Sequence, residues 1–259
     1  MRTASGTSVM IMAVSLRSML FMVVAVTLAA CGGREPAAQQ QFPEHPVQGK
    51  VQNEAQNPAQ VQDTRPVIAA FGDSLSAGFG VEPGKSYPDD LQRLLDAAGY
   101  RYRVANLGVS GDTTTDGVER LPVVLAIHPA IVILEFGGND GLRGLPVAST
   151  QKNLAAMVES LHKSHIEILL AGMTLPRNYG PEYIQSFEQV YVALAREYKL
   201  ARIPFLLEGV GGHPDLTQPD GIHPTAEGAR IVAHNVMKYL QPLLANGSGG
   251  TPGTSGPPY

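Results

Sequence analysis

The sequence predicts an α/β fold of three layers, in which helices cover both faces of a five-stranded parallel sheet. Five short runs of mostly apolar residues, rich in valine, isoleucine and leucine, follow one another after residue 65. Segments whose apolar residues have helical spacing separate these runs, and glycine-rich loops follow several of them. A chain in which strands alternate with helices forms a parallel sheet, because each helix carries the chain back to the end of the sheet at which the previous strand began. These crossovers are right-handed.

The expected strands and helices can be placed in chain order. The strands are predicted at 67–71, 102–107, 130–136, 166–171 and 203–207. The run at 130–136 is nearly all apolar, as in a central parallel strand buried on both faces. The first helix opens at Ser86, a good N-cap, with Pro88 in its first turn, and ends by Gly99. The other helices are predicted at 116–127, 150–163, 181–198 and 225–240.

Length and composition limit the number of domains and the kinds of partner. The chain has 259 residues, and we expect one domain at 65–245. The tail at 246–259 is mostly glycine, serine, threonine and proline and is predicted to be disordered. The net charge is −4, and no basic block follows residue 65, which argues against nucleic-acid binding. Cys31 is the single cysteine, so the chain can form no internal disulfide.

The first 30 residues are predicted to be a signal peptide of a lipoprotein. Residues 19–30 form an apolar run that suits a signal segment and is short for a membrane span. The sequence Leu-Ala-Ala-Cys-Gly at 28–32 resembles the bacterial lipobox, which implies cleavage before Cys31 and a lipid on it; a plain signal peptide is the alternative. Gly32, where aspartate would retain the protein at the inner membrane, implies an outer-membrane lipoprotein facing the periplasm. Residues 31–64, rich in glutamine, alanine and proline, are predicted to be a disordered tether.

The chemistry is expected where the strands end. In an open parallel sheet, ligands bind beyond the carboxyl ends of the strands. The first predicted strand runs into Gly-Asp-Ser at 72–74, and the second and third run into the glycine-rich loops 106–112 and 137–140. The last is followed by Asp-Gly-Ile-His-Pro at 220–224. Ser74 alone fits either a nucleophile or a helix N-cap, but these loops offer what a nucleophile needs.

The predicted catalytic groups are Ser74, His223 and Asp220. Serine is a poor nucleophile at neutral pH, so His223 would take its proton while Asp220 fixes the tautomer of the imidazole. The negative oxygen of a tetrahedral intermediate needs preset donors. Gly111 and Asn139 can supply them with the backbone N–H of Ser74, and Gly108 is an alternative to Gly111.

These motifs resemble those of the SGNH (GDSL-type) hydrolases. The matching blocks are 72–78, 110–112, 137–140 and 220–224, and the resemblance is closest to the bacterial multifunctional esterase, thioesterase and lysophospholipase subgroup (arylesterases). It covers the whole domain and implies a flavodoxin-like sheet, with Ser74, Asp220 and His223 as the triad. By the same resemblance Leu175, Pro176 and Tyr179 belong to a loop that contacts the acyl chain.

The expected function is a serine esterase that needs no metal and no cofactor. Its substrates would be short- to medium-chain acyl esters, thioesters or lysophospholipids, and the lipid on Cys31 would hold it at a membrane. A carbohydrate O-deacetylase of the cell envelope and a non-catalytic binding module are the alternatives. Three further charged side chains are interpreted as structural: Glu135 as a satisfied buried carboxylate, and Asp140 with Arg143 as a local pair.

Overall fold

The computed structural model describes residues 63–246. The predicted signal peptide with Cys31, the tether up to residue 62 and the tail from residue 247 lie outside the described residues, so their assignments stay predictions. Within residues 63–246, no helix combines the length and the apolar character needed to cross a bilayer.

The predicted five-stranded parallel sheet is confirmed. Its strands are β1 (Val67–Gly72), β2 (Arg103–Asn106), β3 (Ile131–Glu135), β4 (Glu167–Ala171) and β5 (Ala201–Ile203). All neighbours are parallel, in the order β2-β1-β3-β4-β5. This is the flavodoxin-like order, in which the winding reverses between β1 and β3 and a ligand site is expected just beyond their carboxyl ends.

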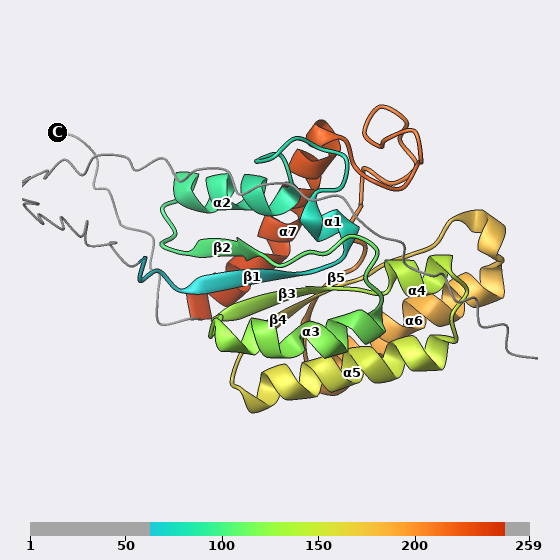
Figure 1. The fold of residues 1–259 in the computed structure, drawn as a ribbon, viewed down its shortest axis with the longest axis horizontal. Helices are drawn as coiled ribbons and strands as arrows, with labels where there is room; N and C mark the ends of the chain where they lie inside the picture. Colours follow the sequence, from blue (N-terminus) through green and yellow to red (C-terminus); the bar gives the residue numbers. More distant parts are fainter. Residues whose placement is uncertain (1–62, 247–259) are drawn as a thin grey trace, which may run out of the picture. The chain divides into compact units, whose positions relative to one another are not determined.

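Helices cover both faces of the sheet. In Figure 1, α2 and α7 lie on one face, α3 and α5 lie on the other, and α6 packs beside α5. The long helices are α2 (Tyr87–Ala97), α3 (Thr114–Ala126), α5 (Val147–Lys163), α6 (Pro181–Tyr198) and α7 (Ala226–Asn246). Three short elements lie at the carboxyl ends of strands, namely α1 (Ser74–Ala77), α4 (Gly138–Leu142) and the 3₁₀ turn η1 (Arg177–Tyr179).

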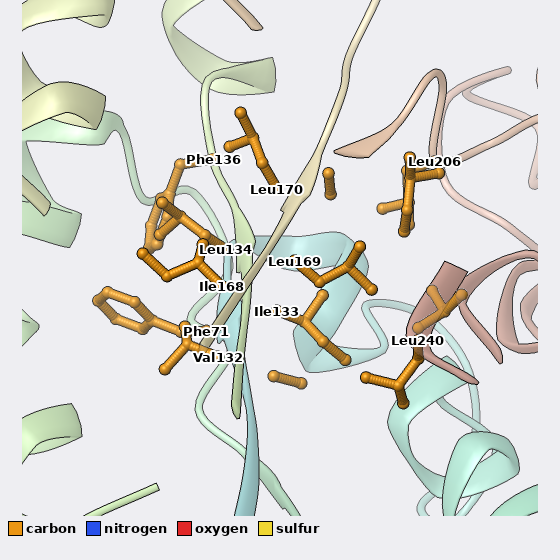
Figure 2. Close-up of a cluster of buried hydrophobic side chains, with 14 of the residues drawn as sticks. Phe71, Val132, Ile133, Leu134, Phe136, Ile168, Leu169, Leu170, Leu206 and Leu240 are labelled. Atoms are coloured by element: carbon orange, nitrogen blue, oxygen red, sulfur yellow. The ribbon is translucent and has the colours of Figure 1, made fainter. Parts of the chain in front are cut away.

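The central strands supply side chains to two buried layers. Successive side chains of a strand point to opposite faces. Figure 2 shows Ile133 and Leu169 on the side of Leu240 of α7, while Leu134 and Ile168 point to the opposite side. All of these side chains are buried. The apolar run predicted as a central strand is therefore β3, with helices on both faces.

The boundaries differ from prediction where local chemistry decides them. The fifth strand was predicted at 203–207, but β5 is Ala201–Ile203. It stops because Pro204 has no N–H for the ladder, and the chain turns there so that Leu206 N–H donates to the Gly172 carbonyl. Helix α3 starts at Thr114, two residues early, because the Thr113 and Asp116 side chains form a capping box.

Candidate active site

Ser74 is the first residue of α1 and not its cap. The N-cap is Asp73, whose carboxylate accepts a hydrogen bond of 3.0 Å from the N–H of Leu75. The hydroxyl of Ser74 is therefore not needed to cap the helix, and the cap interpretation of this residue is wrong. Ser74 stands directly beyond β1, at the winding reversal of the sheet.

Ser74, His223 and Asp220 lie in one hydrogen-bonded row. Ser74 Oγ is 2.8 Å from His223 Nε2, and His223 Nδ1 is 2.6 Å from Asp220 Oδ2. The other carboxylate oxygen of Asp220 accepts from the N–H of Ile222 and of His223, an Asx-type turn that holds the loop. The backbone of His223 is also held, because its carbonyl accepts a hydrogen bond of 2.7 Å from the N–H of Gln218. The row has the geometry in which an imidazole can accept a serine proton.

The environment keeps Asp220 ionised. Burial acts to raise the pKa of Asp220, but the hydrogen bonds from the His223 ring and from two backbone N–H groups outweigh it, so the pKa lies below its ordinary value. A charged Asp220 accepts from the Nδ1–H of His223 and leaves Nε2 free to accept from Ser74. The tautomer that base catalysis needs is thus the one this carboxylate selects.

The backbone N–H groups of two predicted oxyanion donors have no partner within residues 63–246. These are the N–H groups of Ser74 and Gly111. Gly111 has a φ of +90°, a conformation that favours glycine, and the Arg143 guanidinium donates to its carbonyl at 2.8 Å. The N–H of Gly108, in contrast, donates to Asn106 Oδ1. Gly108 is required for space, because a Cβ there would lie 2.2 Å from Ala77 N.

Asn139 lies beside this site with its amide already engaged. Its Nδ2 donates to Asp73 Oδ2 at 3.1 Å and to the Asp112 carbonyl at 2.9 Å. An amide nitrogen has two hydrogens, so Asn139 must share or release one of them to donate to a substrate oxygen. The structure brings Asn139 to the site and also shows what competes for it.

The predicted local pair of Asp140 and Arg143 is wrong. Asp140 is buried and accepts from the backbone N–H and hydroxyl of Thr114, at 2.8 and 2.5 Å. Arg143 is exposed and reaches Gly111 instead. The two side chains point to different neighbours: Asp140, inside α4, contacts the start of α3, and Arg143, the C-cap residue of α4, contacts the loop that carries Gly111.

Glu135 is buried beneath the turn that carries Ser74 and accepts hydrogen bonds from it. Its Oε2 accepts from Ser76 Oγ at 2.8 Å and from the N–H groups of Asp73 and Ser76, whereas Oε1 has no partner within the described residues. The expected satisfied carboxylate is thus only half satisfied. Burial raises the pKa of Glu135 well above its ordinary value, and the nearby Asp73 charge raises it further. Gly72 has no side chain because a Cβ there would meet Glu135 Oε2 at 2.2 Å.

Arg120 of α3 was not predicted from the sequence, yet it joins the loops of the site. Its Nε donates to Asp112 Oδ2 at 2.6 Å, its Nη1 to the Leu107 carbonyl at 3.0 Å and its Nη2 to the Gly72 carbonyl at 3.1 Å. The guanidinium also lies over the Phe71 ring, 4.9 Å from its centroid. It thereby connects the residue before Asp73-Ser74 to both ends of the loop that contains Gly111.

An apolar cavity of about 380 Å³ adjoins the catalytic row. Leu175 and Pro176 line it, as predicted residues of the acyl-contacting loop. Tyr179 does not line it, because its hydroxyl donates to the Leu142 carbonyl and braces η1 against α4. Other apolar residues of the lining were not predicted from the sequence and come from separate segments beyond strand ends: Leu75, Leu142, Met173, Phe205, Leu207 and Ile222. Their position just beyond the carboxyl ends of strands is the signal that could have indicated them.

No group of three or more histidine, cysteine, aspartate or glutamate side chains in residues 63–246 is arranged to hold a metal ion.

The described domain is similar in sequence and in structure to known proteins. The model of the GDSL-like Lipase/Acylhydrolase family matches residues 70–231. Esterase TesA of Pseudomonas aeruginosa is 46% identical over 178 residues, which are 68% of this chain and 89% of that protein. Thioesterase 1/protease 1/lysophospholipase L1 of Escherichia coli is 38% identical over 182 residues, 70% of this chain and 86% of its own length. A crystal structure of TesA aligns with a TM-score of 0.67 at 45% identity, covering 68% of this chain and 99% of that one.

Proposed function

Because the chain belongs to the GDSL-like lipase/acylhydrolase family and is a carboxylic ester hydrolase, we propose that it cleaves short- to medium-chain acyl esters and thioesters through an acyl-enzyme on Ser74. The observation that carries the proposal is the row from Ser74 Oγ through His223 to Asp220, at 2.8 and 2.6 Å, beside an apolar cavity. The names of its relatives, which include an esterase, a thioesterase and lysophospholipase, and an arylesterase, support the same substrate class.

In the first half of the reaction, Ser74 Oγ attacks the carbonyl carbon while His223 Nε2 takes the hydroxyl proton. The carbonyl oxygen becomes negative and is held by the N–H groups of Ser74 and Gly111, with Asn139 as a third donor once it shares a hydrogen. The tetrahedral intermediate collapses, the bond to the leaving oxygen or sulfur breaks, and His223 gives its proton to that atom. Ser74 then carries the acyl group.

In the second half, a water molecule repeats the attack on the acyl-enzyme. His223 Nε2 takes a proton from the water, and the same donors hold the carbonyl oxygen. Collapse releases the carboxylic acid, and the proton returns to Ser74 Oγ. Asp220 stays ionised throughout and stabilises the imidazolium that forms in each half.

The cavity supports acyl groups longer than acetyl. Its volume of about 380 Å³ lies in the range of about 300–1,000 Å³ that small-molecule sites occupy. Apolar side chains such as Leu142 and Met173 line it, which suits an alkyl chain. An acetyl group would leave most of this space empty, so the geometry favours an esterase or thioesterase over a carbohydrate O-deacetylase.

The test compares wild type with Ser74→Ala on p-nitrophenyl butyrate, p-nitrophenyl octanoate and a lysophospholipid. Loss of the nucleophile should lower kcat by several decades, and a fluorophosphonate probe should label wild type but not the variant. Ser149→Ala, an exposed serine of α5, is the matched control and should keep full activity. Undiminished activity in Ser74→Ala would refute the acyl-enzyme. Activity on acetylated glycans alone would favour the O-deacetylase.

We also propose that the enzyme is anchored in the cell envelope through a lipid on Cys31, with the domain facing the periplasm. The lipobox-like sequence at 28–32 supports this, since the single cysteine stands at the position that the motif requires. In cells grown with radiolabelled palmitate, wild type should incorporate label and move with the outer-membrane fraction, and Cys31→Ser should do neither. A labelled Cys31→Ser protein, or an unlabelled wild type, would contradict the anchor.

A further inference from the structure

Phe79 places an exposed aromatic ring against the catalytic histidine. It is 49% exposed, and the other large exposed hydrophobic residues of the described chain are all valines. Its ring centroid is 4.6 Å from that of His223, with the planes tilted by 43°. An isolated exposed apolar side chain needs no explanation, but this one touches the base of the reaction.

Hydrogen bonds connect the backbone of Phe79 to the segments that carry both catalytic side chains. The N–H of Phe79 donates to the Ser74 carbonyl at 3.0 Å. Its carbonyl accepts from Gln218 Nε2 at 2.7 Å, and the N–H of Gln218 donates to the His223 carbonyl at 2.7 Å. The backbone of Phe79 is therefore held between the turn of Ser74 and the loop of His223, so the exposure of its ring does not come from a loose loop.

The chemistry of the site decides which part of a substrate meets Phe79. His223 Nε2 must give its proton to the departing atom, so that atom comes within about 3 Å of Nε2 during acylation. The acyl chain occupies the apolar cavity, whose lining does not include Phe79. The side of His223 that carries the Phe79 ring is thus left for the alcohol or thiol portion of the substrate.

We infer that the exposed face of Phe79 is a leaving-group subsite, which favours esters and thioesters with an aryl or other flat apolar leaving group. This inference rests on the proposed function and deepens it on the leaving-group side. An aromatic leaving group stacks on the ring in offset or edge-to-face geometry while His223 protonates its oxygen. A small alkyl alcohol makes little contact there.

The leaving group departs before deacylation, so Phe79 acts only on acylation, which kcat/KM reports, and only for leaving groups large enough to reach it. If the ring instead served to orient His223, its loss would slow acylation by every ester, and it would also slow deacylation, because His223 is the base in both halves of the reaction.

The experiment compares phenyl butyrate with 2,2,2-trifluoroethyl butyrate. The two esters share an acyl group, but the leaving group is a flat aromatic ring in the first and a small activated alkyl alcohol in the second. Phe79→Ala should lower kcat/KM for the phenyl ester about three- to tenfold and change it less than twofold for the trifluoroethyl ester. Phe79→Leu, which keeps apolar surface but no aromatic face, should lie between. Val192→Ala, an exposed valine of α6, is the control and should change neither value.

The rate at which the butyryl-enzyme loses its acyl group, followed by intact mass after rapid mixing, should be the same in wild type and Phe79→Ala. An equal loss of kcat/KM on both esters, slower deacylation, or no change on the phenyl ester would each overturn the subsite. Thermal melts check that the variants fold. Because the Phe79 ring is exposed, its replacement should cost little stability. Failure of the proposed function itself would appear separately, as hydrolysis that survives in Ser74→Ala.

Discussion

Glu135→Gln tests whether the buried carboxyl beneath the active-site turn is neutral. Glu135 is fully buried, and its Oε2 accepts three hydrogen bonds from Asp73 and Ser76. Burial, reinforced by the Asp73 charge, raises the pKa of Glu135 well above its ordinary value. Burial also raises the pKa of Asp73, but less than that of Glu135, because the hydrogen bond from the Leu75 N–H and the nearby His223 act to lower it. Glutamine keeps the acceptor oxygen and the volume but cannot ionise.

The raised pKa fixes the sign of the pH dependence. Below about pH 4.3, the ordinary value for glutamate, Glu135 is protonated in both the folded and the unfolded chain. As the pH rises, only the unfolded chain ionises, so wild type loses up to about 1.4 kcal/mol of stability per pH unit until the pH reaches the folded-state pKa. Glu135→Gln has no such loss. The variant should be close to wild type near pH 4.5 and more stable than wild type at pH 8.

Glu135→Ala separates the hydrogen bonds from the charge. It leaves the N–H groups of Asp73 and Ser76 and the Ser76 hydroxyl without their acceptor. At about 1 kcal/mol for each hydrogen bond, together with the cavity left by the side chain, the free energy of unfolding should fall by about 3–5 kcal/mol near pH 5. The glutamine variant keeps these bonds and should not show this loss.

Urea unfolding at pH 4.5, 6 and 8 measures these differences, with Glu82→Gln, an exposed glutamate, as the control whose stability should track wild type. A Glu135→Gln variant that is less stable than wild type, by a margin that widens as the pH rises, would refute a neutral Glu135. That result would mean that the folded protein holds Glu135 as an anion.

Three further predictions concern the active site. Arg120→Gln should lower kcat by about 10- to 100-fold with little change in KM, because Arg120 holds the loop that contains Gly111 at a fixed distance from the turn of Ser74. Arg230→Gln, at an exposed arginine, is the control and should have no effect. Asp220→Asn should lower kcat by about 10³–10⁴-fold, because the amide no longer selects the tautomer of His223. In wild type, protonation of Asp220 should not contribute to the pH profile near neutral pH, because hydrogen bonds from the His223 ring and two backbone N–H groups hold the pKa of Asp220 below its ordinary value. Leu142→Trp should reduce kcat/KM for octanoate esters at least tenfold more than for acetate esters, because the larger side chain fills the acyl cavity.

The sheet and the catalytic row were predictable because their signals are local in the sequence. An apolar run that ends in glycine predicts a buried strand and its turn, and the carboxyl ends of parallel strands share one edge. Asp220 and His223 are three residues apart, and only Ser74 had to be brought to them by the fold. Small errors arose where a single residue decides a boundary, as Pro204 does for β5.

The contacts that could not be predicted join a side chain to a segment that is distant in the sequence. Arg120 follows ordinary helical spacing, and nothing near it in the sequence indicates that it reaches Gly72, 48 residues away. Phe79 follows the Gly-Asp-Ser turn closely, yet its contact with His223 requires the loop 204–225 to fold back over it. The apolar cavity draws its walls from several strand ends, so no single stretch of sequence describes it.

The positions of the oxyanion donors depend on one another through the same contacts. The Asp112 carbonyl holds Asn139, the Asp112 carboxylate holds Arg120, and Arg120 holds the Gly72 carbonyl that precedes Asp73-Ser74. Asp73 then closes the ring by accepting from Asn139. Since Gly111 is bonded directly to Asp112 in the chain, a displacement of any member moves a donor relative to Ser74 Oγ. Two substitutions in this closed set of hydrogen bonds should therefore have effects on kcat that are not additive. The first substitution already displaces the donors, so the second has less left to disturb.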